Sequence, residues 1–208
     1  MRVRGFQKEH DSIRADLDEG QLFFWAVEKN IIRCVYTKEG ACGEKSPLGI
    51  RPRCRGAIQV QDRDNALELS SGRLRLTVDK ETVAFRWRDR KGRILLEEGP
   101  KELQETRIPD YTIVDGQAES RLVHTVDGDR SFTENLIPVS EHNGYLGKLC
   151  FRLKAQEDIH GLGQGEEGIY NYRKNTQYLY QHNMRTPIPF FLSNQGYGIL
   201  ADCGSLMV

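Results

Sequence analysis

Three glycines, Gly163, Gly165 and Gly168, have the spacing Gly-x-Gly-x-x-Gly that in other proteins cradles the phosphates of a dinucleotide. Such a site needs a buried strand before the glycines and a helix after them, whose N-terminus binds the pyrophosphate. The preceding residues, KAQEDIH, are polar, and the following IYNYRKNTQYLYQ has no 3.6-residue period. Glu166 and Glu167 would also repel phosphate groups. The segment therefore argues against a nucleotide site and favours turns between strands.

Strand patterns dominate the rest of the chain. In GRLRLTV, the residues Leu74, Leu76 and Val78 alternate with polar residues, which is the period of a half-buried strand. VAFRWR repeats the pattern at Val83, Phe85 and Trp87, and the short polar connector 79–82 predicts a hairpin. A turn at DRKGR then leads into ILLEE, so three neighbouring strands form a meander.

The same texture recurs in QLFFWAV and IIRCVYT, joined at 28–30, and in later strands bounded by turn residues at 127–129 and 143–144. Only residues 8–17 and 100–105 could form a helical turn or two. Many short strands with regularly spaced turns predict an all-β protein, an antiparallel β-sandwich with little helix.

The last part of the chain, IPFFLSNQGYGIL, predicts a strand over 188–193, a turn at 194–196 and a strand over 197–201. The final residues remain apolar, with Leu206, Met207 and Val208 at the very end. We expect residues 1–208 to be a single domain of a longer polypeptide, with the residues from about 187 leading toward the next domain. We also expect exposed apolar surface at 187–208 and a tendency to self-associate.

Composition excludes several classes of partner. The 30 basic and 30 acidic residues cancel, which gives no overall attraction to nucleic acid or to an anionic membrane. The N-terminal residues lack the apolar core of a secretory signal. The five cysteines form no Cys-x-x-Cys pair and have no histidine at zinc-ligand spacing. We therefore expect free thiols, a cytoplasmic location, and neither a metal site nor a cofactor.

A family resemblance rests on the run GLGQ…YLYQHN…IPFFLSNQGYGIL and on the hairpin VAFRWRDRKGRILLEE. Together these resemble the end of the N-terminal β-sandwich of glycoside hydrolase family 31, the α-glucosidase and α-xylosidase group. The close match covers about forty residues. The resemblance implies a galactose-mutarotase-like supersandwich and, in the intact protein, an α-glucosidase-like retaining enzyme with an α-linked oligosaccharide as substrate.

Retaining glycosidases use two carboxylates, a nucleophile and an acid/base. In the family, both carboxylates lie on a (β/α)₈ barrel that follows the sandwich, and nothing in residues 1–208 resembles that barrel. The resemblance thus implies that this chain holds no catalytic residue and that its partner is its own C-terminal barrel. The sequence is also compatible with an oligomer. Adjacent acidic residues such as Glu97 and Glu98 point to opposite faces of a strand and are read as solvated charges.

The family's sandwich also contributes a loop to the sugar pocket. By the matched motif this loop is Tyr180, Gln181, His182 and Asn183, continuing to Arg185 and Thr186. Amide, imidazole and guanidinium groups hydrogen-bond sugar hydroxyls, and an aromatic ring packs on the apolar sugar face. Asn183 stands where family members often have aspartate. A purely structural interdomain loop is the alternative reading, and tyrosines 170, 172, 178 and 180 read as two pairs on strand faces.

Two other functions remain open from the sequence. A free-standing carbohydrate-binding sandwich would bind an oligosaccharide without a barrel. A mutarotase-like epimerase would need a histidine and a glutamate around one sugar ring. No motif selects such a pair among the five scattered histidines.

Overall fold

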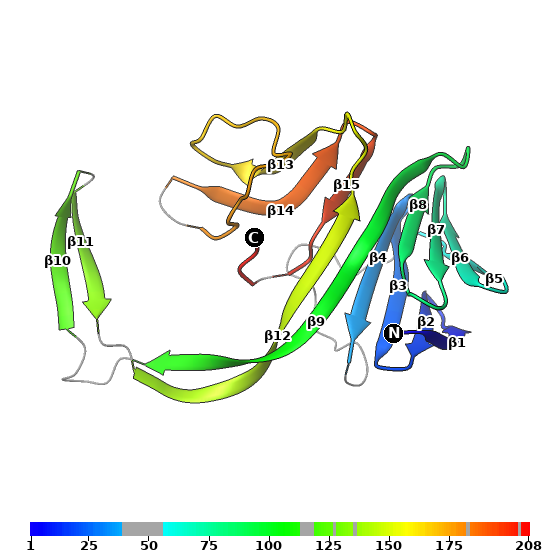
Figure 1. Cartoon of the computed structure of the whole chain (residues 1–208), viewed down its shortest axis with the longest axis horizontal. Helices are drawn as coiled ribbons and strands as arrows, with labels where there is room; N and C mark the ends of the chain where they lie inside the picture. The colour runs from blue at the N-terminus through cyan, green and yellow to red at the C-terminus, as the bar shows by residue number, and fades with distance from the viewer. Residues whose placement is uncertain (39–55, 113–118, 127, 135–136, 182–183, 204) are drawn as a thin grey trace. The chain divides into compact units, whose positions relative to one another are not determined.

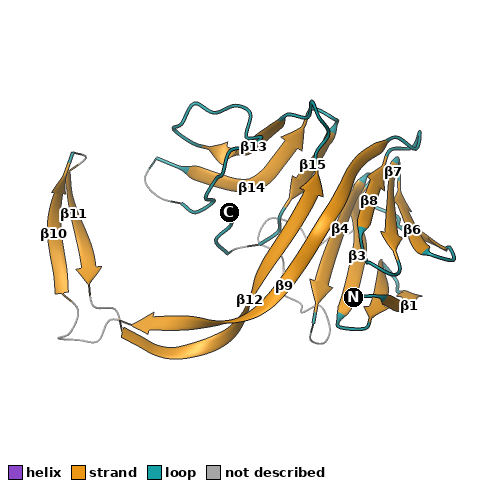
Figure 2. Ribbon diagram, in the orientation of Figure 1, coloured by secondary structure: helices purple, strands orange, loops and turns teal. Residues whose placement is uncertain are grey.

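The computed structural model describes residues 1–38, 56–112, 119–126, 128–134, 137–181, 184–203 and 205–208. These residues contain strands and turns but no helix, so the predicted all-β class is confirmed (Figure 2). It follows that no helix in this part of the chain is long and apolar enough to cross a membrane. The strands, labelled in Figure 1, are β1 (Val3–Lys8), β2 (Ser12–Leu17), β3 (Gln21–Glu28), β4 (Ile31–Thr37), β5 (Gln59–Asp62), β6 (Ala66–Ser71), β7 (Leu74–Asp79), β8 (Phe85–Arg88), β9 (Ile94–Thr112), β10 (Glu119–Thr125), β11 (Gly128–Glu134), β12 (Ile137–Arg152), β13 (Ile159–Gln164), β14 (Thr186–Ser193) and β15 (Tyr197–Leu200).

The described strands form four sheets with the orders β1-β2-β3-β4, β12-β9-β8-β7-β6-β5, β13-β14-β15 and β10-β11. The chain divides into two compact units. The first contains residues 1–99 and 151–208, and the second contains residues 100–150, with the β10–β11 hairpin and most of β9 and β12. The single domain over 1–208 stays a prediction.

The core of the first unit lies between two sheets. On one side, alternate residues of β2 and β3 are buried, among them Ile13 and Phe24. On the other side, Leu69 and Leu76 of β6 and β7 are fully buried. The rings of Phe24 and Phe85 meet between the sheets at a centroid distance of 5.8 Å. This face-to-face packing confirms the predicted sandwich, and every residue of the core cluster precedes residue 88.

The hairpins predicted from alternation are present. β3 pairs with β4, and β7 pairs with β8, both antiparallel. In the β7–β8 connection, one carboxylate oxygen of Asp79 accepts hydrogen bonds from the amide of Thr82 at 2.8 Å, from its hydroxyl at 2.8 Å and from the amide of Glu81 at 3.0 Å. These bonds stabilise the ionised form and lower the pKa of Asp79.

Both segments predicted to have room for a helical turn are strands instead. Residues 8–17 contain a hairpin turn and β2, because Ile13, Ala15 and Leu17 alternate with half-buried charged residues and pack into the core. Residues 100–105 lie within the long strand β9, where pairing in the sheet overrides their helix propensity. The predicted turn at 143–144 is also wrong. Gly144 lies inside β12, and a Cβ there would collide with the side chain of Ile108.

Large apolar side chains are exposed between residues 187 and 208, as predicted. Ile188 and Leu192 of β14 are each 49% exposed, and Leu206 and Val208 are 66% and 75% exposed. Self-association through this surface stays a prediction.

Candidate functional site

The glycine-rich segment is a strand with an irregularity. β13 pairs antiparallel with β14, and the register shifts between Gly161 and Gly163. Gly161, Leu162 and Gly163 all have positive φ angles, of 109°, 62° and 90°. Such a bulge redirects a side chain from its usual face of the sheet. Residues 165–181, hereafter the site loop, follow β13 without forming a helix, so the context of a dinucleotide site is absent here.

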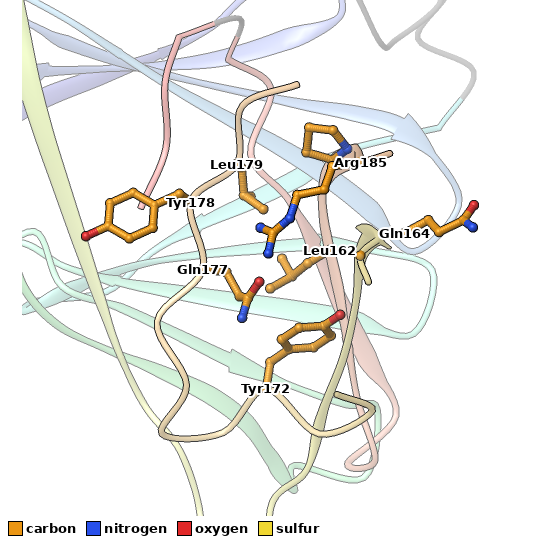
Figure 3. Close-up of a pocket in the computed structure, with 9 residues that line it drawn as sticks. Leu162, Gln164, Tyr172, Gln177, Tyr178, Leu179 and Arg185 are labelled. Carbon is orange, nitrogen blue, oxygen red and sulfur yellow. The ribbon is translucent and has the colours of Figure 1, made fainter. Parts of the chain in front are cut away.

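A shallow hollow lies between β13 and the site loop. Its space is about 250 Å³, and part of this is open solvent. Leu162 of β13 faces Gln177 of the loop across it, whereas the side chains of Gln164 and Tyr178 point outward at its two sides (Figure 3). Other residues of the wall are Gly165, Tyr172, Leu179, Arg185 and Pro187. Phenol, amide and guanidinium groups side by side have the chemistry that binds sugar hydroxyls.

The predicted site residues are brought together only in part. Arg185 lines the hollow and forms an ion pair with Glu167. Thr186 begins β14 and pairs with Gln164 of β13. Tyr180, which is 51% exposed, and Gln181 do not line the hollow.

His182 and Asn183 lie outside the described residues.

The tyrosine pairs are not on strand faces, contrary to the expectation from their spacing. Residues 170–180 form turns and one isolated bridge, in which Leu179 pairs with Met207. Tyr170 is 84% exposed and Tyr178 is 54% exposed. The even spacing of the tyrosines does not indicate a strand here, because hydrogen bonds of individual side chains set the path of this loop. Backbone pairing with a neighbouring strand does not.

Sequence reasoning missed Gln164, Tyr172 and Gln177 as members of the hollow. Gln164 belongs to the GLGQ motif, so the motif was the available signal for it. No spacing pattern indicates that Gln177 faces Leu162, because the site loop has no regular period.

One prediction concerns Leu162, whose positive φ is strained in a residue with a side chain. We expect the free energy of unfolding of Leu162→Gly to be about 1 kcal/mol higher than that of Leu162→Ala. Both variants remove the side chain from the hollow, but only glycine relieves the backbone strain. Urea unfolding of the two variants measures the difference. Equal stabilities would show that the position bears no strain.

A serine, an aspartate and a histidine also meet in the second unit, but not as a catalytic triad. The Ser140 hydroxyl donates to Asp110 at 2.8 Å, and His142 Nδ1 lies 3.0 Å from the other carboxylate oxygen. These two bonds lower the pKa of Asp110. In a triad the histidine lies between serine and aspartate, whereas here the aspartate lies between the other two. In the part of the chain that the structure describes, no group of three or more His, Cys, Asp or Glu side chains could hold a metal ion.

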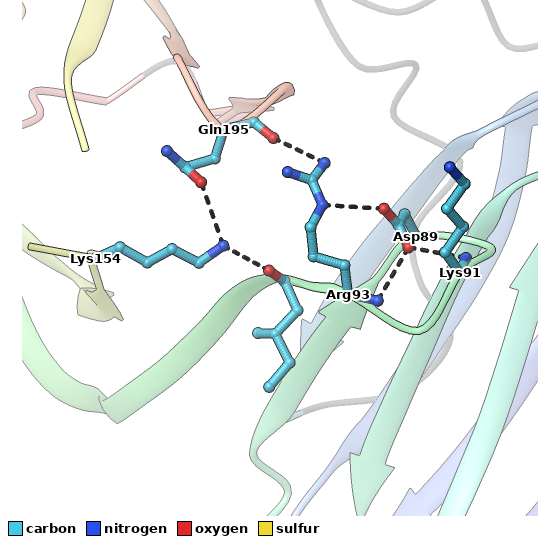
Figure 4. Close-up of polar contacts among 6 residues, drawn as sticks. Asp89, Lys91, Arg93, Lys154 and Gln195 are labelled. Carbon is cyan, nitrogen blue, oxygen red and sulfur yellow. Dashed lines mark hydrogen bonds and ion pairs between the residues drawn. The ribbon is translucent and has the colours of Figure 1, made fainter. Parts of the chain in front are cut away.

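Polar contacts tie the candidate site to the sandwich. Lys154 Nζ donates to the backbone oxygen of Ile94 at 2.7 Å and to the Gln195 side chain at 3.4 Å (Figure 4). Arg93 donates to the backbone oxygen of Gln195 at 3.4 Å. The β8–β9 hairpin is therefore joined to the β14–β15 turn, which fixes one end of the sheet that carries the hollow.

Hydrogen bonds within the β8–β9 hairpin order its side of this contact. Asp89 accepts from the Arg93 side chain at 3.1 Å and from the amides of Arg93 and Lys91 at 3.0 and 2.9 Å. The arginine is thus held in the hairpin by the aspartate while it reaches the β14–β15 turn.

Solved structures of known enzymes share this fold, although no family model matches the sequence. A family 31 α-xylosidase from Xanthomonas citri is 19% identical with a TM-score of 0.68, and the match covers 96% of this chain and 19% of the enzyme. A family 31 α-xylosidase from a soil metagenome, in complex with xylose, is 17% identical with a TM-score of 0.64, over 97% of this chain and 28% of that one.

A family 31 dextranase from Flavobacterium johnsoniae, in complex with isomaltotriose, is 15% identical with a TM-score of 0.57, over 97% of this chain and 22% of the enzyme. The chain thus spans between 19% and 28% of the length of these three structures. It has the fold of one segment of glycoside hydrolase family 31 enzymes, as its motifs predicted.

Proposed function

We propose that this chain is the N-terminal, non-catalytic β-sandwich of a family 31 α-glycosidase. The observation that carries the proposal is the fold match, which covers nearly the whole chain but about a fifth to a quarter of each enzyme. The GLGQ motif agrees with it, because its glycines form the bulge beside the hollow.

The proposed intact protein hydrolyses α-glycosidic bonds with retention, and its two carboxylates lie on a (β/α)₈ barrel outside this chain. The sandwich packs on that barrel. Exposed apolar side chains on β14 support this, since uncovered apolar area of this kind marks interaction surfaces. The named enzymes include xylosidases and a dextranase, and we propose an α-glucosidase-type preference from the sequence resemblance.

The residues from Tyr180 to Thr186 are proposed to border the sugar. Arg185 supports this role, because it is held at the hollow by Glu167 beside amide and phenol groups. A sugar hydroxyl would meet donors and acceptors of both kinds there.

The test compares the isolated chain with the intact gene product. We expect no turnover of aryl α-glucosides or aryl α-xylosides by the chain alone, since it lacks the carboxylate pair. The intact protein should hydrolyse one of them and release a product of retained anomeric configuration, which proton NMR follows directly. In the intact protein, Gln181→Ala should raise KM, whereas the exposed control Lys174→Ala should leave it unchanged.

Two results would overturn the proposal. Turnover by the pure chain would place catalysis in this sandwich. An intact product without hydrolase activity, combined with calorimetric binding of a maltose-type sugar by the chain and its loss in Tyr180→Ala, would establish a carbohydrate-binding module instead.

A further inference from the structure

We infer that Glu157 is the positioning residue of the site loop, the buried group that fixes the loop's path beside β13. Glu157 is only 1% exposed, which is unusual for a carboxylate. It accepts hydrogen bonds from the Ser193 hydroxyl at 2.5 Å, from the Tyr197 hydroxyl and from the Lys154 amide at 2.8 Å. A buried carboxylate is tolerated only when such donors compensate it.

The same turn holds the beginning of the site loop. Arg173 donates one side-chain nitrogen to the backbone oxygens of Lys154 and Glu157, at 2.6 and 2.8 Å. The Tyr172 amide donates to the backbone oxygen of Ile159 at 2.8 Å. The carbonyls that receive Arg173 are therefore those of the turn that the Glu157 side chain closes.

Asn171 adds a second connection. Its side-chain oxygen accepts from the amides of Ile159 and Arg173, at 3.2 and 3.0 Å. Its side-chain nitrogen donates to Asp158 at 2.6 Å. The site loop is thus attached at three consecutive residues to the segment 154–159, so a change at Glu157 reaches the loop through the backbone.

The groups facing the carboxylate make the ionised form the stable one. Burial by itself raises the pKa of Glu157, but the hydrogen bonds from Ser193, Tyr197 and the Lys154 amide, with the Lys154 charge, outweigh it and lower the pKa below 4.5. Burial and the neighbouring carboxylate raise the pKa of Tyr197, so its hydroxyl keeps the proton it donates. The arrangement is therefore fully formed above pH 4.5 and is lost as the pH falls through the lowered pKa of Glu157.

Amide hydrogen exchange of this 208-residue chain tests the inference. We expect Glu157→Gln to lower the protection factors of the Tyr172 and Asn175 amides by about tenfold or more, because the charged hydrogen bonds by which the Glu157 carboxylate anchors the segment 154–159 are lost. The Tyr172 amide is bonded to the backbone oxygen of Ile159 at 2.8 Å, and the Asn175 amide to the backbone oxygen of Tyr172 at 3.0 Å. The ratio between wild type and variant should hold from pH 7 to about 4.5 and disappear below the pKa of Glu157.

The matched control is Asp79→Asn, which removes another multiply hydrogen-bonded carboxylate of lowered pKa, in the β7–β8 connection. It should leave the protection of Tyr172 and Asn175 unchanged at neutral pH. Tyr197→Phe removes one donor and keeps the carboxylate, and it should lower the protection by a few-fold. Unchanged protection in Glu157→Gln and Tyr197→Phe, or an equal loss in the control, would overturn the inference.

The inference that this anchor serves sugar binding rests on the proposed function. Hydrogen exchange without sugar tests the anchor alone, so failure of one is distinguishable from failure of the other.

Discussion

Replacing Gly163 with alanine should destabilise the protein by about 3 kcal/mol or more. A Cβ at this position would collide with the backbone oxygen of Thr186 and come within 2.6 Å of the backbone nitrogen of Ile188. Backbone atoms of a paired strand cannot swing aside as a side-chain end does. The φ of 90° adds strain for any residue other than glycine. Urea unfolding followed by far-UV circular dichroism measures the loss.

Gly92→Ala provides the matched control for this variant. Gly92 has a φ of 82°, close to that of Gly163, but a Cβ there meets nothing within 4 Å. This variant should lose only the strain of the positive φ, about 1 kcal/mol. Equal losses in the two variants would show that the close approach of β13 to β14 is not what requires glycine.

The second large effect is expected in the core. Phe24→Ala should lower the free energy of unfolding by about 3–5 kcal/mol, which is a large share of a typical domain's stability of about 5–15 kcal/mol. Phe24 is fully buried between the two sheets and its ring lies against that of Phe85. Truncation removes the apolar surface that the Phe24 ring buries on folding, and it leaves a cavity between the two sheets.

Tyr170→Ala is the comparison for the core variant, because this ring is 84% exposed. It should change the free energy of unfolding by less than about 0.5 kcal/mol. Denaturant melts of the two variants against the wild type decide the point. A small loss for Phe24→Ala would mean that the two sheets do not depend on each other for stability.

The sandwich was predictable from sequence because its signal is local. Leu76 and Val78 alternate with polar residues, and both are fully buried where that alternation placed them. The failures arose where local and tertiary preferences differ. β2 carries charged residues between its buried ones, and residues 100–105 favour helix by composition yet pair in a sheet. Gly144 makes room for Ile108, which no turn pattern reveals.

The candidate site was predictable only through its motif. Arg185 followed from the motif and lines the hollow. Gln177 did not, because its position depends on a loop path set by single hydrogen bonds. Arg173, for example, binds carbonyls that lie 16 and 19 residues away in the chain. Contacts of that range leave no periodic trace in the sequence.

Because the core cluster between the two sheets lies before residue 88, its residues are synthesised first. A ribosome adds about 5–20 residues per second, so residues 100–150 occupy it for about 3–10 s after the first part of unit 1 is complete. All residues of the core cluster are therefore synthesised before β13, β14 and β15. Lys154, whose Nζ bonds the carbonyl of Ile94, is also added after the core cluster. The segment that carries the candidate site is thus made last, and the core cluster contains none of its residues.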